Sequence, residues 1–350
     1  MEKRAKIGYF AAANGYDGFR SYFGEIFNPE NYTRLYVLKG GPGTGKSSLM
    51  RSVYSRFCES CNHAEVIHCS SDPDSLDGVI LQNGNVCIAV IDGTAPHERD
   101  TVYPGAVDEI INLGSSWDTR WLEAKREDIF ALNQEKREAY KAAYTYLSSA
   151  GQAKREIDKI KNSRFDYKSA KETAKTLAES IKKSNFGSVT TRLISAFGKS
   201  GKVRLDTINE ISDTSYTISG DGHAASIFLS LLLEETKDSA RVIRFPTPFD
   251  DKSCEALYYS DARLSFSVGG GADKEIDADE FIKTNSMSYE RTRVLSELHD
   301  RSLEEAKRWF SIAADLHARL EKIYFEAMNF EKNDMVLAAL NEDISSKLGS

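Results

Sequence analysis

The chain has 350 residues, of which 41% are apolar, and its 46 Lys and Arg against 53 Asp and Glu give a net charge of −7. This length predicts two core-bearing units, the apolar share excludes a disordered chain, and the acidic balance excludes a global attraction to nucleic acid or anionic membranes, so any anion site has to be local. The sequence has no apolar run of membrane-spanning length and no apolar export segment after its charged N-terminus, and its five cysteines fit reduced thiols, so we expect a cytoplasmic protein.

Residues 35–92 have an α/β pattern in which short apolar runs are separated by turn residues and one helical segment. The expected strands are 35–38, 65–69, 79–81 and 86–91, and the expected helix is 47–57. The expected strand 86–91 is apolar without interruption, which is typical of a strand buried on both faces of a sheet. We therefore predict a mostly parallel sheet. Asn83-Gly84 predicts one hairpin with a type I′ turn inside that sheet.

The residues GGPGTGKS at positions 40–47 match the phosphate-loop pattern G-x-x-x-x-G-K-[ST] in full and lie between an expected strand and an expected helix. Glycines allow the backbone N–H groups to point into one hollow at the positive end of the helix, where they bind phosphate oxygens. Lys46 is expected to contact the β- and γ-phosphates, and Ser47 to ligate Mg²⁺. The predicted nucleotide-binding residues are Gly40, Gly41, Pro42, Gly43, Thr44, Gly45, Lys46, Ser47 and Ser48.

A carboxylate at the end of a neighbouring buried strand normally completes such a magnesium site. Asp92 follows the strand 86–91, so we predict that it is the second Mg²⁺ ligand and that Lys46 and Asp92 are catalytic. Gly93 stands where many ATPases have a Glu that orients the attacking water, so a base has to come from elsewhere. We assign this catalytic role to His97 and Glu109; the other candidates are Glu98, Asp108, Asp72 and Asp74, and each of the six could instead be a solvated or capping side chain.

Two long amphipathic helices are predicted further along the chain. Apolar residues recur at a spacing near 3.6 around Tyr140, Tyr144 and Leu147, and again over residues 303–323. We expect these helices to pack against each other or against the sheets, with a coiled coil to a partner as the alternative.

Residues 154–204 hold fourteen basic and five acidic residues. This basic segment, which we take to be helical, could bind an anionic or protein partner or lean over the nucleotide phosphates. The alternative is a solvated helical face.

A weak internal repeat relates the two halves of the chain. When residues 39–49 are aligned with 218–228, two glycines coincide and Ser47 falls on Ser226. The strand-like residues 66–67 and 87–90 then match 242–243 and 265–268. We predict a tandem duplication, with chance similarity as the alternative.

In this alignment the second half lacks the charged residues of the first. Ala225 takes the place of Lys46, Gly270 takes the place of Asp92, and Asp221 adds a negative charge to the loop. Like charges that share one site repel each other. We therefore predict that the second half does not bind nucleotide.

These motifs resemble those of an uncharacterised family of bacterial P-loop ATP-binding proteins, known as predicted ATPases or nucleotide kinases and built from two similar halves. The residues that carry the resemblance are 35–48, 68–77, 92–97 and 103–110. The resemblance implies a tandem P-loop fold with a helical insertion in each half and no particular reaction. In that family both halves can carry a phosphate loop, whereas the second loop here lacks the Lys and the final Gly.

The predicted fold is an α/β P-loop NTPase fold with a mostly parallel sheet, tandemly duplicated, in which a long helical insertion or hairpin follows each half. The expected units are an active nucleotide-binding core (1–118), a helical insertion (119–186), a degenerate core (187–282) and a C-terminal helical region (283–350). The predicted function is Mg²⁺-dependent ATP hydrolysis in the first half that shifts the helical arms, with ATP and Mg²⁺ as cofactors. The alternatives are a small-molecule or nucleotide kinase and an ATP-binding switch that does not hydrolyse.

Overall fold

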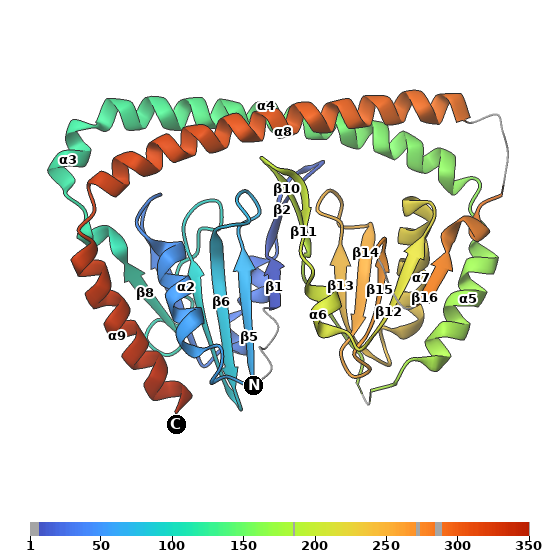
Figure 1. Ribbon diagram of the computed structural model, residues 1–350, viewed down its shortest axis with the longest axis horizontal. Helices are drawn as coiled ribbons and strands as arrows, with labels where there is room; N and C mark the ends of the chain where they lie inside the picture. The colour runs from blue at the N-terminus through green and yellow to red at the C-terminus, as the bar shows by residue number, and fades with distance from the viewer. Residues whose placement is uncertain (1–6, 185, 271–273, 284–288, 350) are drawn as a thin grey trace.

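The computed structural model describes residues 7–184, 186–270, 274–283 and 289–349, and within these residues two six-stranded sheets lie under a pair of long helices (Figure 1). The first sheet contains β1 (Ile7–Phe10), β4 (Arg34–Lys39), β5 (His63–His68), β6 (Leu76–Asn83), β7 (Val86–Asp92) and β8 (Asp108–Asn112). The second contains β9 (Ser188–Thr191), β12 (Thr214–Ser219), β13 (Arg241–Pro246), β14 (Cys254–Tyr259), β15 (Leu264–Val268) and β16 (Lys274–Asp277).

The two sheets have the same topology. Their strand orders are β1-β5-β6-β7-β4-β8 and β9-β13-β14-β15-β12-β16. Among the described strands of each sheet, the pairs β5·β6 and β6·β7, and correspondingly β13·β14 and β14·β15, are antiparallel, while the other neighbours are parallel. The prediction of an α/β fold with mostly parallel sheets and two similar halves is therefore confirmed at this level, and the matched segments of the repeat lie in corresponding strands.

Each half also contains a small hairpin and two short or medium helices. These elements are β2 (Ala12–Gly15), β3 (Gly18–Ser21), α1 (Phe23–Ile26) and α2 (Lys46–Phe57) in the first half, and β10 (Ser195–Gly198), β11 (Gly201–Arg204), α6 (Thr207–Ile211) and α7 (Gly222–Thr236) in the second. Phe10 and Leu193 exchange backbone hydrogen bonds of 2.8 and 3.2 Å. These bonds join the two halves at corresponding positions, two residues before β2 and two residues before β10.

The central strands are apolar throughout because both faces of each sheet are covered. In β4, Leu35 and Val37 face a core shared with Phe245 and Tyr258 of the second sheet. The alternate residues of β4, Tyr36 among them, face α2 on the other side. Alternation along a strand sends successive side chains to opposite faces, so a two-faced core requires an uninterrupted apolar run.

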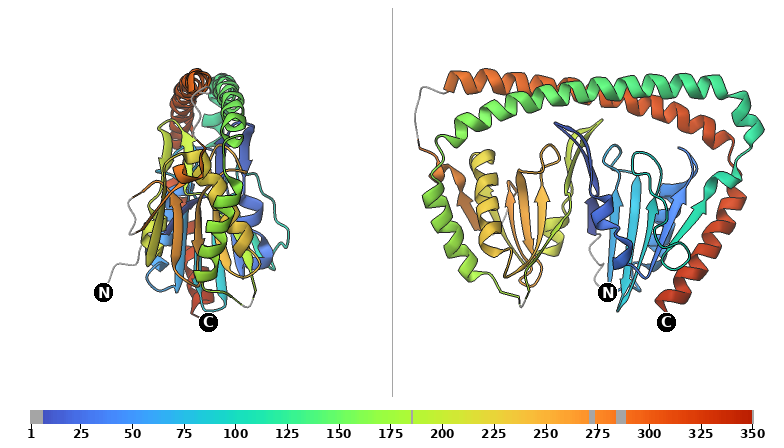
Figure 2. Two further views of the ribbon diagram at one scale, coloured as in Figure 1. Left: turned by 90° about the vertical axis from the view of Figure 1, so that its right-hand side faces the viewer. Right: turned by 180° about the vertical axis from the view of Figure 1, so that it is seen from behind.

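Two long helices, α4 (Arg126–Asn162) and α8 (Tyr289–Glu326), cross above both sheets, and we call them the arms (Figures 1 and 2). The arms run antiparallel and pack through small and branched residues, with Ala139 of α4 close to Ala313 and Leu316 of α8. The short helix α3 (Thr119–Ala124) precedes α4. The prediction that the two long helices pack against each other is confirmed.

The helix that follows each arm packs on the opposite half of the protein. Helix α5 (Tyr167–Ser180), which follows α4, packs on α7, and α9 (Phe330–Leu348), which follows α8, buries Leu340 and Ile344 beside α2 (Figure 1). The turn between each arm and its following helix, residues 163–166 after α4 and 327–329 after α8, is called an elbow. Equivalent isolated bridges attach the elbows to the cores: Phe165 pairs with Ile282, and Met328 pairs with Trp117. Each arm thus connects the two sheets.

Two details of the sequence prediction are corrected. The hairpin of β6 and β7 is present, but Asn83 pairs with Val86, so its central residues are Gly84 and Asn85. Gly84 has a φ of +57°, whereas Asn85 is not one of the described residues with a positive φ. A type I′ turn needs a positive φ at both central residues, and a type II′ turn needs it only at the first, where glycine is preferred. The turn is therefore of type II′.

The basic segment 154–204 is not one helical face. It spans the end of α4, all of α5 and the strands β9–β11. At least eight of its fourteen basic side chains form ion pairs among the described residues: Lys154, Arg155, Lys159, Lys161, Lys171, Arg192, Lys199 and Lys202. Most of the local charge is therefore neutralised within the chain. Separately, no helix of the described residues combines the length and apolarity needed to cross a membrane.

Candidate functional site

Residues 40–45 connect β4 to α2 and form a curled loop at the N-terminus of that helix. Gly43 and Gly45 have φ values of +70° and +84°, a region that L side chains rarely adopt. A Cβ atom on Gly43 would also lie 2.5 Å from the backbone oxygen of Glu321. The loop therefore depends on glycine at position 43 for both its backbone conformation and its close contact with α8.

The ammonium group of Lys46 lies at the mouth of this loop. Its Nζ donates hydrogen bonds of 2.8 and 2.9 Å to the carbonyl oxygens of Gly40 and Gly41. It also lies 3.6 Å from Oδ2 of Asp92, and about a tenth of the Lys46 side chain is exposed. The structure thus brings together Lys46 and Asp92, two of the four residues that the sequence predicts as catalytic.

Asp92 ends β7 and is paired with Leu38 of β4, which places its carboxylate beside the loop. Its Oδ1 accepts hydrogen bonds from the backbone N–H and the hydroxyl of Thr94, at 2.9 and 2.6 Å. Burial raises the pKa of Asp92 above its usual range, although Lys46 and Thr94 act in the opposite direction. Its other carboxylate oxygen, Oδ2, faces the Lys46 ammonium.

Ser47 has a structural contact that recurs in the second half. Its Oγ accepts a hydrogen bond of 2.9 Å from the N–H of Leu76, the first residue of β6. The aligned residue Ser226 accepts a bond of 2.8 Å from the N–H of Cys254, the first residue of β14. Each serine therefore attaches its helix to the same strand of its sheet, and Ser47 keeps a second lone pair for a metal ion.

His97 is buried, with 5% of its side chain exposed. Its ring stacks on Phe23 with the centroids 3.9 Å apart, and its Nε2 lies 3.3 Å from Oδ2 of Asp77. Asp77 raises the pKa of Asp92, which places these carboxylates in one electrostatic environment. The sequence did not indicate Asp77 as a residue of the site. Its only signal there is that it stands at the start of the strand after the loop 69–75.

The structure does not bring Glu109 to the loop. Its carboxylate forms an ion pair with Arg34, the first residue of β4, whereas the loop follows Lys39 at the other end of that strand. Its register partner is Tyr36, in the middle of β4.

The other candidate bases are also placed away from a catalytic position or are already paired. Asp108 accepts hydrogen bonds from the backbone N–H groups of Val102 and Tyr103. Asp72 forms an ion pair of 3.2 Å with Lys199 of the β10–β11 hairpin. Glu98 and Asp74 are exposed, as is Ser48 on the first turn of α2.

The end of α8 and the start of α9 cover the loop, which the sequence did not indicate. A Cβ on Gly41 would lie 3.2 Å from the ring of Tyr324, and Asn333 donates a hydrogen bond of 2.9 Å to the carbonyl oxygen of Thr44. The backbone oxygen of Glu321 also lies against Gly43, so the last turns of α8 contact the loop directly.

His317 lies one turn before Glu321, with its Nε2 3.6 Å from Oε1 of that residue. Partial burial lowers the pKa of His317 to about 4, with contributions from Lys136 and Lys46. Because the folded pKa is below the unfolded value of about 6.5, the neutral ring is favoured by folding, and stability is lost as pH falls from about 6.5 toward 4.

His317→Gln should therefore show a smaller loss of unfolding free energy between pH 7 and pH 5 than the wild type. Urea unfolding at the two pH values measures this difference. An unchanged pH dependence in the variant would show that His317 does not contribute to it.

The second half has no comparable loop. Helix α7 begins at Gly222, three residues before Ala225, so the residues that align with the end of the first loop are helical. The carboxylate of Asp221 accepts hydrogen bonds of 3.0 and 3.1 Å from the N–H groups of His223 and Ala224 and pairs with Lys161 at 2.6 Å. Although burial opposes it, Lys161 holds the pKa of Asp221 below its usual range. The helix N-terminus is thus capped from within the chain.

One position of the repeat alignment is corrected by the sheet register. Asp92, the last residue of β7, pairs with Leu38, and Val268, the last residue of β15, pairs with Ile218. Leu38 and Ile218 are each the penultimate residue of their strand, so Val268, and not Gly270, occupies the place of Asp92. No carboxylate stands at either residue, and the conclusion about the second half is unaffected.

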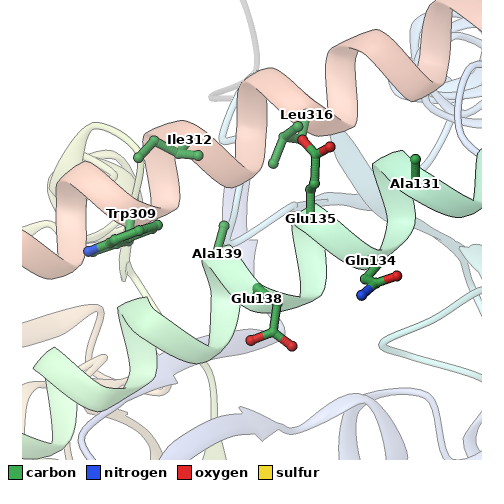
Figure 3. A pocket seen from close by; sticks show the side chains of 8 residues that line it. All are labelled: Ala131, Gln134, Glu135, Glu138, Ala139, Trp309, Ile312 and Leu316. Atoms are coloured by element: carbon green, nitrogen blue, oxygen red, sulfur yellow. The ribbon is translucent and has the colours of Figure 1, made fainter. Parts of the chain in front are cut away.

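A groove of about 490 Å³ lies between the arms (Figure 3). It is lined by side chains from α4 and α8 alone: Ala131, Gln134, Glu135, Glu138, Ala139, Trp309, Ile312 and Leu316. None of the residues of the loop 40–47 lines it. The groove is therefore a feature of arm packing and is separate from the candidate site.

Comparison with known protein families, curated proteins and solved structures finds no match to the chain. Among the described residues, no group of three or more His, Cys, Asp or Glu side chains is arranged to hold a metal ion. Ser47 and Asp92 supply one hydroxyl and one carboxylate, and Mg²⁺ commonly takes its other ligands from phosphates and water. These two residues therefore suit an ion that arrives with a nucleotide.

Proposed function

We propose that the first half binds ATP with Mg²⁺ at residues 40–47 and hydrolyses the ATP slowly. The observation that carries this proposal is the convergence of a glycine-dependent loop, the Lys46 ammonium and the Asp92 carboxylate at the N-terminus of α2. The positive end of a helix and its free N–H groups favour bound anions.

Ser47 and Asp92 are the residues that would hold Mg²⁺. Bound there, the ion would neutralise charge on the phosphate oxygens. Lys46 would exchange its bonds to the Gly40 and Gly41 carbonyls for bonds to phosphate, and Asp92 would keep its hydrogen bonds to Thr94. The loop and the strand end would thus orient the nucleotide without a large rearrangement of the sheet.

The positions of the candidate bases favour slow turnover. His97 is enclosed by Phe23 and tethered to Asp77, and Glu109 is held at the far end of β4. A general base has to reach the attacking water within hydrogen-bonding distance. This enclosure of His97 also favours a second candidate function, an ATP-dependent switch with negligible hydrolysis.

Single-turnover assays with γ-labelled ATP distinguish these functions. Released phosphate supports hydrolysis, and bound but unchanged ATP supports the switch. Label transferred to an added small molecule or nucleotide would instead support a kinase. An absence of ATP binding would contradict all three.

We also infer that the two halves are a tandem duplication of one unit with a P-loop NTPase fold. The shared strand order, the equivalent bonds of Ser47 and Ser226, and the equivalent elbow bridges support this inference. Matched contacts at several corresponding positions favour duplication over chance similarity. The exchange of α5 and α9 between the halves follows the same symmetry.

The two serines provide a matched pair of variants. Ser47→Ala and Ser226→Ala each leave a backbone N–H without its partner, which should cost about 1–3 kcal/mol of unfolding free energy. Only Ser47→Ala should also weaken the Mg²⁺ dependence of ATP binding. Titration of both variants with ATP, with and without Mg²⁺, measures this, and equal Mg²⁺ dependence would show that Ser47 has a structural role alone.

A further inference from the structure

The hairpins β2–β3 and β10–β11 correspond in the two halves and have the same turn. In each hairpin, a pair of glycines faces each other across a two-residue turn. The first residue of the turn is Tyr16 in β2–β3 and Lys199 in β10–β11. The strands β2, β10 and β11 lie between the two sheets, below the arms (Figure 1). Lys199 therefore has in the second half the place that Tyr16 has in the first.

The tip of each hairpin packs on the other half of the protein, and on the same loop of that half. A Cβ on Gly198 would lie 3.3 Å from the backbone oxygens of Ser70 and Ser71, in the loop 69–75 that joins β5 to β6. Correspondingly, the N–H of Tyr16 donates a hydrogen bond of 3.0 Å to the carbonyl oxygen of Phe249, in the loop 247–253 that joins β13 to β14. The duplication thus places the turn of the second hairpin against the half that carries the phosphate loop.

The loop 69–75 borders the candidate site. Strands β4, β5 and β7 run in the same direction, because β5 and β7 are both antiparallel to β6 and β4 is parallel to β7. The loops 40–45 and 69–75, which follow two of these strands, therefore leave the sheet at the same edge. The loop 69–75 ends at Leu76, whose N–H donates the 2.9 Å hydrogen bond to Oγ of Ser47. The tip of β10–β11 thus rests on a loop that adjoins a predicted Mg²⁺ ligand.

Lys199 brings to this loop a charge that can change partners. Its Nζ lies 3.2 Å from Oδ1 of Asp72, and 37% and 45% of the two side chains are exposed. Because an exposed ion pair is weak in water, the ammonium can exchange this carboxylate for another anion. Tyr16 is instead fixed by packing, since its ring stacks on Phe249 and its hydroxyl lies 2.9 Å from Nε2 of His299. The turn of the second hairpin therefore presents an exchangeable cation, and the turn of the first does not.

The electrostatics of α8 agree with this placement. Partial burial lowers the pKa of His317, and the ammonium groups of Lys136, Lys46 and Lys199 act in the same direction. Because water and salt screen charges over about 10 Å, these cations have to lie near one ring. An anion bound at the loop 40–47 would therefore lie near positive charge from both halves.

We propose that the second half supplies Lys199 to the nucleotide site of the first, where its ammonium leaves Asp72 and binds the γ-phosphate of ATP. This inference rests on the proposed function. ADP has no γ-phosphate, so the contact distinguishes ATP from ADP and makes the packing of the two halves depend on the nucleotide. A cation on the γ-phosphate also stabilises the charge on its oxygens during phosphoryl transfer. The half without a phosphate loop thereby takes part in ATP recognition.

The first test compares the affinities of Lys199→Met for AMP-PNP and for ADP, each with Mg²⁺. Methionine keeps most of the length of the side chain and removes its charge. The Kd for AMP-PNP should rise about tenfold, or about 1.4 kcal/mol, and the Kd for ADP should not change. Lys199→Arg keeps the charge and should keep most of the preference for AMP-PNP. A Kd for AMP-PNP that is unchanged in Lys199→Met, or that rises by the same factor as the Kd for ADP, would overturn the proposal.

The second test uses Asp72→Asn to separate this role from an ion pair that only holds the halves together. Lys199→Met and Asp72→Asn remove the same ion pair, so a purely structural role predicts the same change in both variants. We expect instead that Asp72→Asn, which frees the ammonium, does not raise the Kd for AMP-PNP. Equal rises in the two variants would overturn the inference and leave the proposed function intact. If the wild type binds neither AMP-PNP nor ADP, the proposed function fails and the inference fails with it.

Discussion

Lys46→Ala should abolish ATP turnover and weaken ATP binding at least about 30-fold, since truncating one partner of a close charge pair typically costs 2–5 kcal/mol. The ammonium lies at the loop mouth and would face the β- and γ-phosphates. Its bonds are to loop carbonyls and its ion pair is with Asp92, so the variant removes no apolar core contact. Calorimetry with AMP-PNP and a phosphate-release assay measure the two effects.

A loss of stability in Lys46→Ala has to be separated from a loss of function. Without the ammonium, the buried Asp92 carboxylate has no described cationic partner within 4.0 Å, which destabilises the folded state. Lys46→Ala combined with Asp92→Asn should recover most of the unfolding free energy and still not bind ATP. Lys39→Met, which removes an ammonium bonded to the Gly93 carbonyl, should bind normally. Turnover by Lys46→Ala at the wild-type rate would contradict the phosphate-loop assignment.

The parts of the site that could be predicted from the sequence are those encoded by contiguous residues. The loop 40–47 carries its own signal, because a glycine-rich turn between an apolar run and a helix has few other structures available. Asp92 could be placed because parallel strands end at one edge of a sheet, so its position after an apolar run puts it beside the loop. The pairing of Leu38 with Asp92 agrees with that reasoning.

The parts that could not be predicted depend on contacts between distant residues. Glu321 and Asn333 reach the loop from about 280 positions away, because α8 crosses the molecule and α9 packs beside α2. Alternation along a strand does not reveal that Glu109 points toward Arg34, since this depends on which strand lies next to β8. The four-residue strands of the N-terminal hairpin are too short for a periodic pattern.

Titration of the full chain with AMP-PNP should give one binding site per chain, and no site in Lys46→Ala. The second half lacks a lysine at the aligned position, where Ala225 is buried within α7. The first N–H groups of that helix are already bound by the Asp221 carboxylate, which in turn holds Lys161. An arriving phosphate would therefore meet a negative charge and N–H groups that are already satisfied.

Removing that charge should not create a second site. Asp221→Asn keeps a side-chain oxygen that can cap the helix, so the fold should be preserved. The loop would still lack the backbone curl of residues 40–45, because α7 begins three residues before Ala225, and Val268 would still stand in place of Asp92. The stoichiometry of Asp221→Asn should therefore stay at one site per chain, with the Kd of the wild type. A stoichiometry of two, in the wild type or in this variant, would show that the second half binds nucleotide.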